Sequence, residues 1–438
     1  MSLSPKRREE IIDALRRGTV PRNSLDAFAT GLDRFRETLD DELRKVSEGS
    51  GGFKAIRGDY GCGKTFFTRW LADRARQLGF ATSEVQVSET ETPLHRLETV
   101  YRRSMERLAT TDSPQGALRN IVDGWFFALE EDVLAEGRLD PSDTAGLLAR
   151  TSELMEQRLA KVTATAPLFA AALRGYREAR GAGDGATAEG LLAWLAGQPN
   201  VAASVKRPAG LKGDIDHFGA LSFLQGMLVV LRDSGSPGLL LVLDEVETIQ
   251  RVRGDVRDKS LNALRQWLDE IDSGRFPGLM LVITGTPAFF DGPQGVQRLA
   301  PLAQRLHVDF ATDARFDNPR SVQLRLAPFT IERLVEVGRR VRDIFAEGAK
   351  ASDRVRARVD DDFIRTLAER VTGDLGGKVG IAPRIFLKKL VADLLDRVEL
   401  FDDFDPRQHY RLTIAEGELE PRERAARGAI DVDEIELD

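Results

Sequence analysis

A glycine-rich loop at residues 58–65, with the sequence GDYGCGKT, lies between two segments of different periodicity. Residues 53–57 (FKAIR) before it have the composition of a buried strand, and residues 65–79 after it have the apolar spacing of a helix that stops at Gly79. The loop matches the pattern G-x-x-x-x-G-K-[ST], which is a strong signal for phosphate binding when a strand precedes it and a helix follows. The sequence therefore predicts a phosphate-binding loop.

The residue types of this loop follow from the chemistry of holding an anion. Several backbone N–H groups must point at one anion in a tight turn, and residues without a Cβ atom allow this. The first turn of the following helix adds the positive end of its dipole. Lys64 would reach the β- and γ-phosphates of ATP, and the Thr65 hydroxyl would bind Mg²⁺. The predicted nucleotide-binding residues are Gly58, Asp59, Tyr60, Gly61, Cys62, Gly63, Lys64, Thr65 and Phe66.

Cys62 is the only cysteine of the chain, so no internal disulfide is expected. Its position among the variable residues of the loop favours a role as a small filler. The alternative is a reactive thiol, because a helix N-terminus and a nearby lysine lower the pKa of a thiol. The four histidines are scattered along the chain and predict no metal-ligand cluster.

The second chemical signal is an apolar strand that ends in acids, LLLVLDEVE at residues 239–247. Ligands of open parallel sheets bind at the carboxyl ends of the strands, where this pattern puts Asp244. Asp244 would complete the Mg²⁺ site with Thr65, and Glu245 would act as general base on the attacking water. Such a base contributes roughly 10²- to 10⁴-fold in rate. A solvated acidic turn after the strand is the structural alternative.

A third apolar strand, GLMLVITGTPAFF at residues 278–290, carries two threonines near its end. A hydroxyl at that end of a sheet can hold the attacking water or the γ-phosphate. Thr284 is the first candidate for this role and Thr286 the second. Strands often end in threonine, so a purely structural role is the alternative.

Short strands with apolar residues on both faces, separated by helices, indicate a parallel sheet that helices cover on both sides. Residues 80–88 and 321–330 are two further candidate strands. Helical patterns fill residues 93–232, with Asp214 as a candidate N-cap for the last helix, and three more follow residue 330. The predicted fold is an α/β P-loop NTPase. Its predicted regions are N-terminal helices (1–52), the first part of the core (53–92), a helical insertion (93–235), the second part of the core (236–330), a small helical domain (331–415) and an acidic, partly disordered tail (416–438).

The overall composition limits the partners of the chain. A net charge of −7 gives no general attraction to nucleic acid or anionic lipid. Local basic groups could still contact a phosphate backbone, with solvated helix surface as the alternative. These groups are Arg102, Arg103, Arg107, Lys206 and Arg207. The sequence has no long apolar run and no secretory signal at residues 1–20, so we expect a reducing, cytoplasmic location and no membrane contact.

In this order the segments resemble an AAA+ ATPase of the initiator and clamp-loader type, similar to the Orc/Cdc6-like group, over about residues 20–92 and 236–400. VPRNSLDAFATGLDR resembles the segment that packs on adenine in that group, which implies an adenine-side segment within residues 1–52. The resemblance also implies that the helical domain at 331–415 is a helical lid. GIAPRIFLKKL resembles its second sensor, which implies that Arg384 meets the γ-phosphate from the start of a lid helix. LAPLAQRLHVDF offers Arg305, with Arg298 nearby, as a finger that reaches the nucleotide of a neighbouring subunit. The alternative is that the arginine in this helix has a purely structural role.

More narrowly, the chain resembles the family of BREX system ATP-binding proteins that includes BrxD, nearly from end to end. The motifs that carry this resemblance are ALRRGTVPRNSLDAFATGLDR, IRGDYGCGKTFFTRWLA, LLLVLDEVETIQR, ITGTPAFFDGP and APRIFLKK. The resemblance implies a role in phage defence, commonly alongside a large helicase-like protein.

Two features depart from an initiator. The long separation of Lys64 and Asp244 implies a helical insertion of roughly 100 residues, which is large enough to bind a partner. The chain after the lid is short and acidic, which leaves little room for a winged-helix domain that grips DNA.

The sequence is compatible with three functions. The first is an ATP-driven switch that forms homo-oligomers and acts on DNA or on a DNA-translocating partner. The second is a signalling module with slow turnover and no DNA contact. The third is a nucleoside kinase, against which Asp244, Glu245 and Arg384 weigh, because water activation is useless for transfer to another acceptor.

Overall fold

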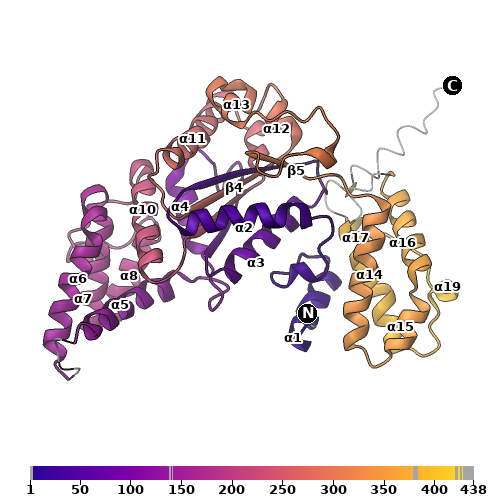
Figure 1. The fold of residues 1–438 in the computed structure, drawn as a ribbon, viewed down its shortest axis with the longest axis horizontal. Helices are drawn as coiled ribbons and strands as arrows, with labels where there is room; N and C mark the ends of the chain where they lie inside the picture. Colours follow the sequence, from indigo (N-terminus) through magenta and orange to yellow (C-terminus); the bar gives the residue numbers. More distant parts are fainter. Residues whose placement is uncertain are drawn as a thin grey trace.

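The computed structural model describes residues 3–137, 140, 142–377, 383–419, 423, 424 and 427. Its central feature is a five-stranded parallel sheet with the order β2-β3-β4-β1-β5 (Figure 1). The strands are β1 (Gly52–Arg57), β2 (Ala81–Gln86), β3 (Leu239–Asp244), β4 (Leu279–Gly285) and β5 (Gln323–Arg325). The predicted parallel α/β sheet is therefore confirmed.

Alternate residues of the central strands are buried against opposite faces of the sheet, as the runs of apolar residues require. In β3, Leu240 and Val242 belong to a hydrophobic cluster with Phe67 and Leu71 of helix α3 (Lys64–Gln77). The other three leucines of the strand, Leu239, Leu241 and Leu243, belong to a second cluster with residues of α4 (Leu97–Glu106), α10 (His217–Asp233) and α11 (Gly254–Asp272). Helices thus cover both faces.

Four strands end earlier than their sequence patterns predict, and the one predicted at 80–88 ends at Gln86. The strand predicted at 278–290 ends at Gly285, because Pro287 begins the short helix α12 (Pro287–Asp291), where its missing N–H removes no hydrogen bond. The strand predicted to run to residue 247 ends at Asp244, before the 3₁₀ helix η2 (Val246–Arg251). The candidate at 321–330 keeps only the three residues of β5.

The described residues between β2 and β3 form helices, with no strand among them, in agreement with the helical patterns at 93–232. The helices other than α4 and α10 are α5 (Leu118–Ala135), α6 (Thr144–Thr165), α7 (Pro167–Gly181), α8 (Gly185–Leu195) and α9 (Ala203–Lys206). Helices α5 to α8 lie at one end of the molecule (Figure 1). The prediction of Asp214 as N-cap was wrong, because the Oδ1 atom of Asp216 accepts the hydrogen bond from the Gly219 N–H at 2.7 Å.

Helices after β5 lie at the opposite end of the molecule, beside the N-terminal helix α1 (Pro5–Arg16), which contacts α14 and α17 (Figure 1). These helices are α14 (Ile331–Gly348), α15 (Ser352–Arg358), α16 (Asp361–Asp374), α17 (Pro383–Lys388), the π-helix η6 (Lys389–Leu395), α18 (Asp396–Leu400) and α19 (Pro406–His409). The remaining elements are α2 (Asp33–Ser47), α13 (Ala300–Leu306) and the 3₁₀ helices η1 (Leu25–Ala27), η3 (Val296–Arg298), η4 (Ala314–Phe316) and η7 (Glu416–Glu418).

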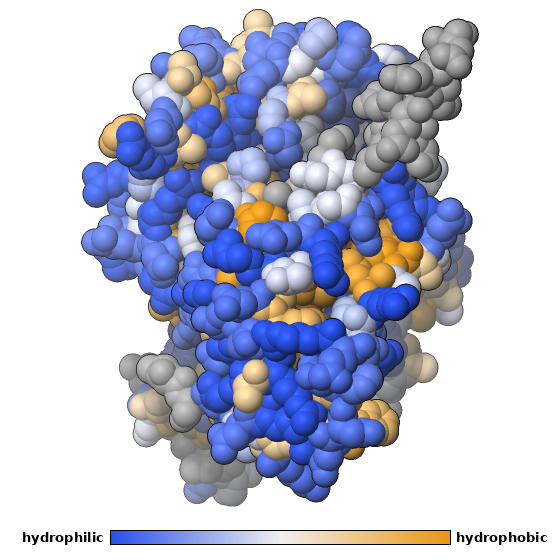
Figure 2. Space-filling view, turned by 90° about the vertical axis from the view of Figure 1, so that its right-hand side faces the viewer, coloured by the Kyte–Doolittle hydropathy of each residue, from blue (hydrophilic) through white to orange (hydrophobic). Residues whose placement is uncertain are grey.

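The face that carries the C-terminal helices is mostly hydrophilic, with small separate hydrophobic patches (Figure 2). In the described parts of the chain, no helix combines the length and apolarity needed to cross a membrane. Most of the predicted disordered tail falls on residues 420–422, 425, 426 and 428–438, which lie outside the described residues.

Candidate nucleotide site

A cavity of about 490 Å³ lies where the glycine-rich loop, the end of β3, the N-terminal segment and the C-terminal helices meet. Its volume is in the range of small-molecule sites, about 300–1,000 Å³. Apolar side chains such as Val20, Phe28 and Leu32 line it beside loop residues 60–66. The segment whose sequence resembles an adenine-side segment therefore contributes to the wall of this cavity.

The loop has the backbone geometry that its glycines allow. Gly61 and Gly63 have φ angles of +78° and +93°, a region that L-residues rarely occupy. At Gly58 an added Cβ atom would lie 2.3 Å from the Sγ atom of Cys62. Cys62 is buried, and this burial raises the pKa of its thiol although Lys64 opposes the effect. Burial and a raised thiol pKa favour a role of Cys62 as a small filler over a role as a reactive thiolate.

Lys64 begins helix α3 and turns back over the loop. Its Nζ atom donates hydrogen bonds to the carbonyl oxygens of Gly58 at 2.8 Å and Asp59 at 3.2 Å. The ammonium group also lies 5.0 Å from the centre of the Tyr60 ring. Lys64 is thus a buried cation at the mouth of a glycine loop, which suits a phosphate group.

The side chains predicted to bind Mg²⁺ meet across the sheet edge. The Thr65 Oγ1 atom donates to the Oδ2 atom of Asp244 at 3.3 Å. A hydroxyl and a carboxylate are oxygen ligands of the kind Mg²⁺ takes, with phosphate oxygens and waters for the remaining positions. In the described part of the chain, no three His, Cys, Asp or Glu side chains gather into a metal cluster. The pair of oxygen atoms from Thr65 and Asp244 therefore fits an Mg²⁺ that also binds the nucleotide phosphates.

Glu245 follows β3 in an unusual backbone conformation, with φ of +60°. Its N–H donates to the Thr284 Oγ1 atom at 2.9 Å, and its carboxylate accepts a hydrogen bond from the Gln86 Nε2 atom at 3.2 Å. Non-glycine residues in this region are strained and cluster at functional sites. Sequence reasoning missed Gln86. The sequence carries only a weak signal for this residue. Gln86 is the last residue of β2, and the sheet register pairs it with Asp244.

Thr284 is fully buried, and its hydroxyl donates to the Oδ1 atom of Asp244. It contacts Asp244 and Glu245, which line the cavity, but it does not line the cavity itself. Thr286, the second candidate, is buried at the start of α12 and is likewise absent from the cavity wall. The position of Thr284 suits orientation of the two acids more than contact with water or phosphate.

Glu247 is a third acid of the site, which sequence reasoning missed. It lines the cavity with 3% of its surface exposed, and its carboxylate lies 4.0 Å from the Nζ atom of Lys64. Neither carboxylate oxygen has a hydrogen-bond partner among the described residues. Burial raises the pKa of this carboxyl, opposed by the charge of Lys64. The signal for it in the sequence was the second glutamate of the LDEVE motif.

The three predicted arginines lie in two places. Arg384 lines the cavity, where its Nε atom donates to the Oε1 atom of Glu423 at 2.9 Å. Arg305 and Arg298 do not line it. Arg305 pairs with Asp269 of α11 at 2.6 Å, and Arg298 pairs with Asp258 of the same helix at 3.0 Å.

Most of the candidate DNA-contacting cations have partners within the chain. Arg103 pairs with Glu106 at 3.0 Å, Arg102 lies 3.9 Å from the same carboxylate, and Lys206 lies 3.5 Å from Asp214. The Arg107 guanidinium donates to the carbonyl of Glu84. Arg207 is on the exposed surface. These contacts favour the solvated helix surface over a shared basic patch.

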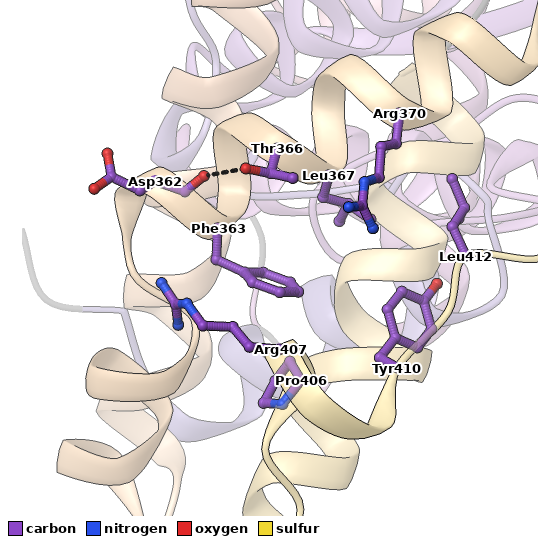
Figure 3. A pocket seen from close by; sticks show the side chains of 9 residues that line it. All are labelled: Asp362, Phe363, Thr366, Leu367, Arg370, Pro406, Arg407, Tyr410 and Leu412. Atoms are coloured by element: carbon purple, nitrogen blue, oxygen red, sulfur yellow. Dashed lines mark hydrogen bonds between the residues drawn. The ribbon is translucent and has the colours of Figure 1, made fainter.

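A second, smaller cavity of about 240 Å³ lies between α16 and the segment around α19 (Figure 3). Phe363 and Tyr410 form part of its wall. Arg407 lies over the Phe363 ring and pairs with Asp360, and the Tyr410 hydroxyl donates to Asp393 at 3.2 Å. Because these polar groups already have partners, we assign this cavity no chemistry.

A parallel sheet, a glycine loop before a helix, and acidic side chains at the end of a central strand are the features of an α/β protein with a P-loop-like core. Residues 3–414 match the family described as BREX system ATP-binding protein BrxC/D, so the chain belongs to that family of ATP-binding proteins. This match confirms the narrower resemblance found in the sequence. Among curated proteins, none matches the chain.

Proposed function

We propose that the protein binds ATP with Mg²⁺ at this cavity and hydrolyses it. The observation that carries the proposal is the meeting of Lys64, Thr65 and Asp244 from two distant parts of the chain in one cavity, with the Thr65 and Asp244 oxygens 3.3 Å apart. Bound Mg²⁺ supplies charge that stabilises the phosphate oxygens during transfer. Family membership supports ATP as the nucleotide.

Each acid of the site has a distinct proposed task. Asp244 accepts hydrogen bonds from two hydroxyls, those of Thr65 and Thr284, which fixes the direction of its carboxylate. Glu245 takes the proton of the attacking water, and Gln86 orients its carboxylate. Glu247 stays beside Lys64 as a counter-charge. A base next to the proposed Mg²⁺ site supports hydrolysis, because it can activate a water for attack on the γ-phosphate.

We propose that this turnover drives assembly or remodelling on DNA or on a helicase-like, DNA-translocating partner in BREX phage defence. The AAA+ architecture with a C-terminal lid, a helical insertion for a partner and a homo-oligomeric state belongs to this proposal. The five-stranded parallel order supports it, as do the helices that approach the cavity from the C-terminal side.

A second candidate function is a nucleotide-dependent signalling switch without direct DNA contact. The observation that favours it is the internal pairing of Arg102, Arg103 and Lys206, three of the candidate cations for a phosphate backbone. The net charge of −7 also favours the switch without DNA contact, because a negatively charged protein is repelled by a phosphate backbone.

One experiment separates these functions. ATP turnover and particle size are measured for the wild type and for Asp244→Asn, with and without a non-hydrolysable ATP analogue, duplex DNA and single-stranded DNA. Turnover that requires Asp244 and rises with DNA supports the assembly function. Turnover that requires Asp244 and ignores both DNAs supports the switch, whereas wild-type protein without turnover contradicts ATP hydrolysis.

A further inference from the structure

Three cations next to the cavity bind acidic groups from the end of the chain. We call Arg384, Lys388 and Lys389 the cationic cluster. Arg384 donates from Nε to the Oε1 atom of Glu423 at 2.9 Å and from Nη2 to the carbonyl of Glu418 at 2.6 Å. Lys388 and Lys389 donate to the two carboxylate oxygens of Glu418 at 2.9 and 2.8 Å. Two carboxylates therefore meet three cations.

The acidic residues belong to a docked segment and are not loose surface groups. Ile414 and Leu419 are buried in the hydrophobic cluster of the C-terminal helices, with 6% and 5% of their surface exposed. The Glu423 side chain is 6% exposed. Burial opposes the ionisation of Glu418, yet hydrogen bonds from Lys389 and Lys388 lower its pKa to about 2. The segment is thus anchored by apolar contacts on both sides of Glu418.

The docked carboxylate and a nucleotide phosphate require the same donors. Arg384 and Glu423 line the same cavity as Lys64 and the glycine loop. A guanidinium binds a carboxylate and a phosphate with the same pair of N–H groups. The Nε–Nη2 edge of Arg384 can therefore bind either the docked carboxylate or a nucleotide phosphate, but not both at once. Glu423 also adds a negative charge to a cavity that would receive an anion.

We propose that residues 414–419 and Glu423 are an internal acidic ligand of the cationic cluster, which holds Arg384 away from the nucleotide and is displaced by ATP phosphate. This inference rests on the proposed ATP site and adds its regulation. The segment keeps the site in a low-affinity state, and a factor that removes the segment raises ATP affinity. Because binding and release are linked, ATP must in turn loosen the segment.

The first measurement is ATP affinity by calorimetry for Glu423→Gln and Glu418→Gln, with Glu416→Gln as matched control. Glu416 lies in the same segment and is exposed, so its substitution removes one charge without touching the cluster. We expect Glu423→Gln to tighten ATP binding at least about 5-fold, the lower end of typical couplings between sites. The control should match the wild type. Equal affinities of Glu423→Gln and the wild type overturn the inference.

A second arm separates release of Arg384 from a general loss of negative charge. In an Arg384→Ala background, Glu423→Gln should no longer change ATP affinity, whereas an effect of unchanged size overturns competition for Arg384. Hydrogen–deuterium exchange of residues 412–419 should rise in the wild type when ATP is added, and unchanged exchange counts against displacement. If neither the wild type nor any variant binds ATP, the proposed function fails first and the inference falls with it.

Discussion

The hydroxyl of Thr284, on β4, accepts a hydrogen bond of 2.9 Å from the backbone N–H of Glu245, the residue after β3. The same hydroxyl donates to the carboxylate of Asp244. One buried side chain therefore holds both the left-handed backbone of Glu245 and the direction of the Asp244 carboxylate. Thr284 is thus a shared partner of the two acids that we assign to Mg²⁺ and to water activation, in addition to Thr65 on Asp244 and Gln86 on Glu245.

Thr284→Val keeps the shape of the side chain and removes the hydroxyl. Loss of two hydrogen bonds, each about 0.5–1.5 kcal/mol, should lower turnover roughly 5- to 100-fold while ATP affinity changes little. Thr284→Ser is the control, because it retains the hydroxyl and should keep most of the turnover. Steady-state kinetics with both variants measures the effect, and normal turnover of Thr284→Val would contradict it.

Lys64→Ala removes the cation that the loop carbonyls of Gly58 and Asp59 hold in place. We expect ATP affinity and turnover to collapse together, because the β- and γ-phosphates lose their charged partner. Calorimetry measures affinity, and circular dichroism checks that the fold persists. ATP binding at wild-type affinity by the folded variant would refute the phosphate-loop assignment.

Glu245→Gln separates binding of ATP from its hydrolysis. The amide keeps the side-chain volume but cannot take a proton from water, so turnover should fall about 10²- to 10⁴-fold while ATP affinity persists. Asp244→Asn is the comparison, since it alters the residue that we propose as Mg²⁺ ligand instead. If Glu245→Gln turns over normally and Glu247→Gln does not, then Glu247 is the base, and Glu245 is only an acid at the end of a strand.

Glu247→Gln tests the buried carboxylate through the pH dependence of stability. The pKa of Glu247 is raised in the folded state, so the folded protein binds this proton more readily than the unfolded chain. Its contribution to stability is therefore favourable at low pH and is lost as pH rises through the raised pKa. We expect the melting temperature of Glu247→Gln to exceed that of the wild type near neutral pH, and the difference to vanish near pH 4. A constant difference would contradict this assignment.

Arg305→Ala tests assembly, since Arg305 is partly exposed and away from the cavity of its own subunit. We expect normal ATP binding, reduced turnover, and partial recovery of turnover when wild-type subunits are mixed in. Arg298→Ala is the matched variant, because that arginine also pairs with α11. Turnover per subunit that does not depend on protein concentration, together with normal activity of both variants, would count against a finger in trans.

The sequence alone determined the parts of the site that are local in the chain. The strand, the glycine loop and the first turn of α3 are contiguous, so their spacing predicted the loop conformation and the place of Lys64 and Thr65. The apolar runs of β3 and β4 predicted a parallel sheet with both faces covered. Asp244 could be placed because a strand that ends in an acid has a defined position at the sheet edge.

Only the tertiary structure decided which distant groups meet. Gln86 reaches Glu245 because β2 pairs with β3 in one register, and Thr284 reaches Asp244 because β4 is the other neighbour of β3. Arg384 meets Glu423, 39 residues later, because the segment before Glu423 packs its Ile414 and Leu419 side chains against the C-terminal helices. Periodicity and motifs describe residues that are neighbours in the sequence. Strand order, register and the packing of the C-terminal segment depend instead on packing energy summed over the whole core, which cannot be read from a local sequence pattern.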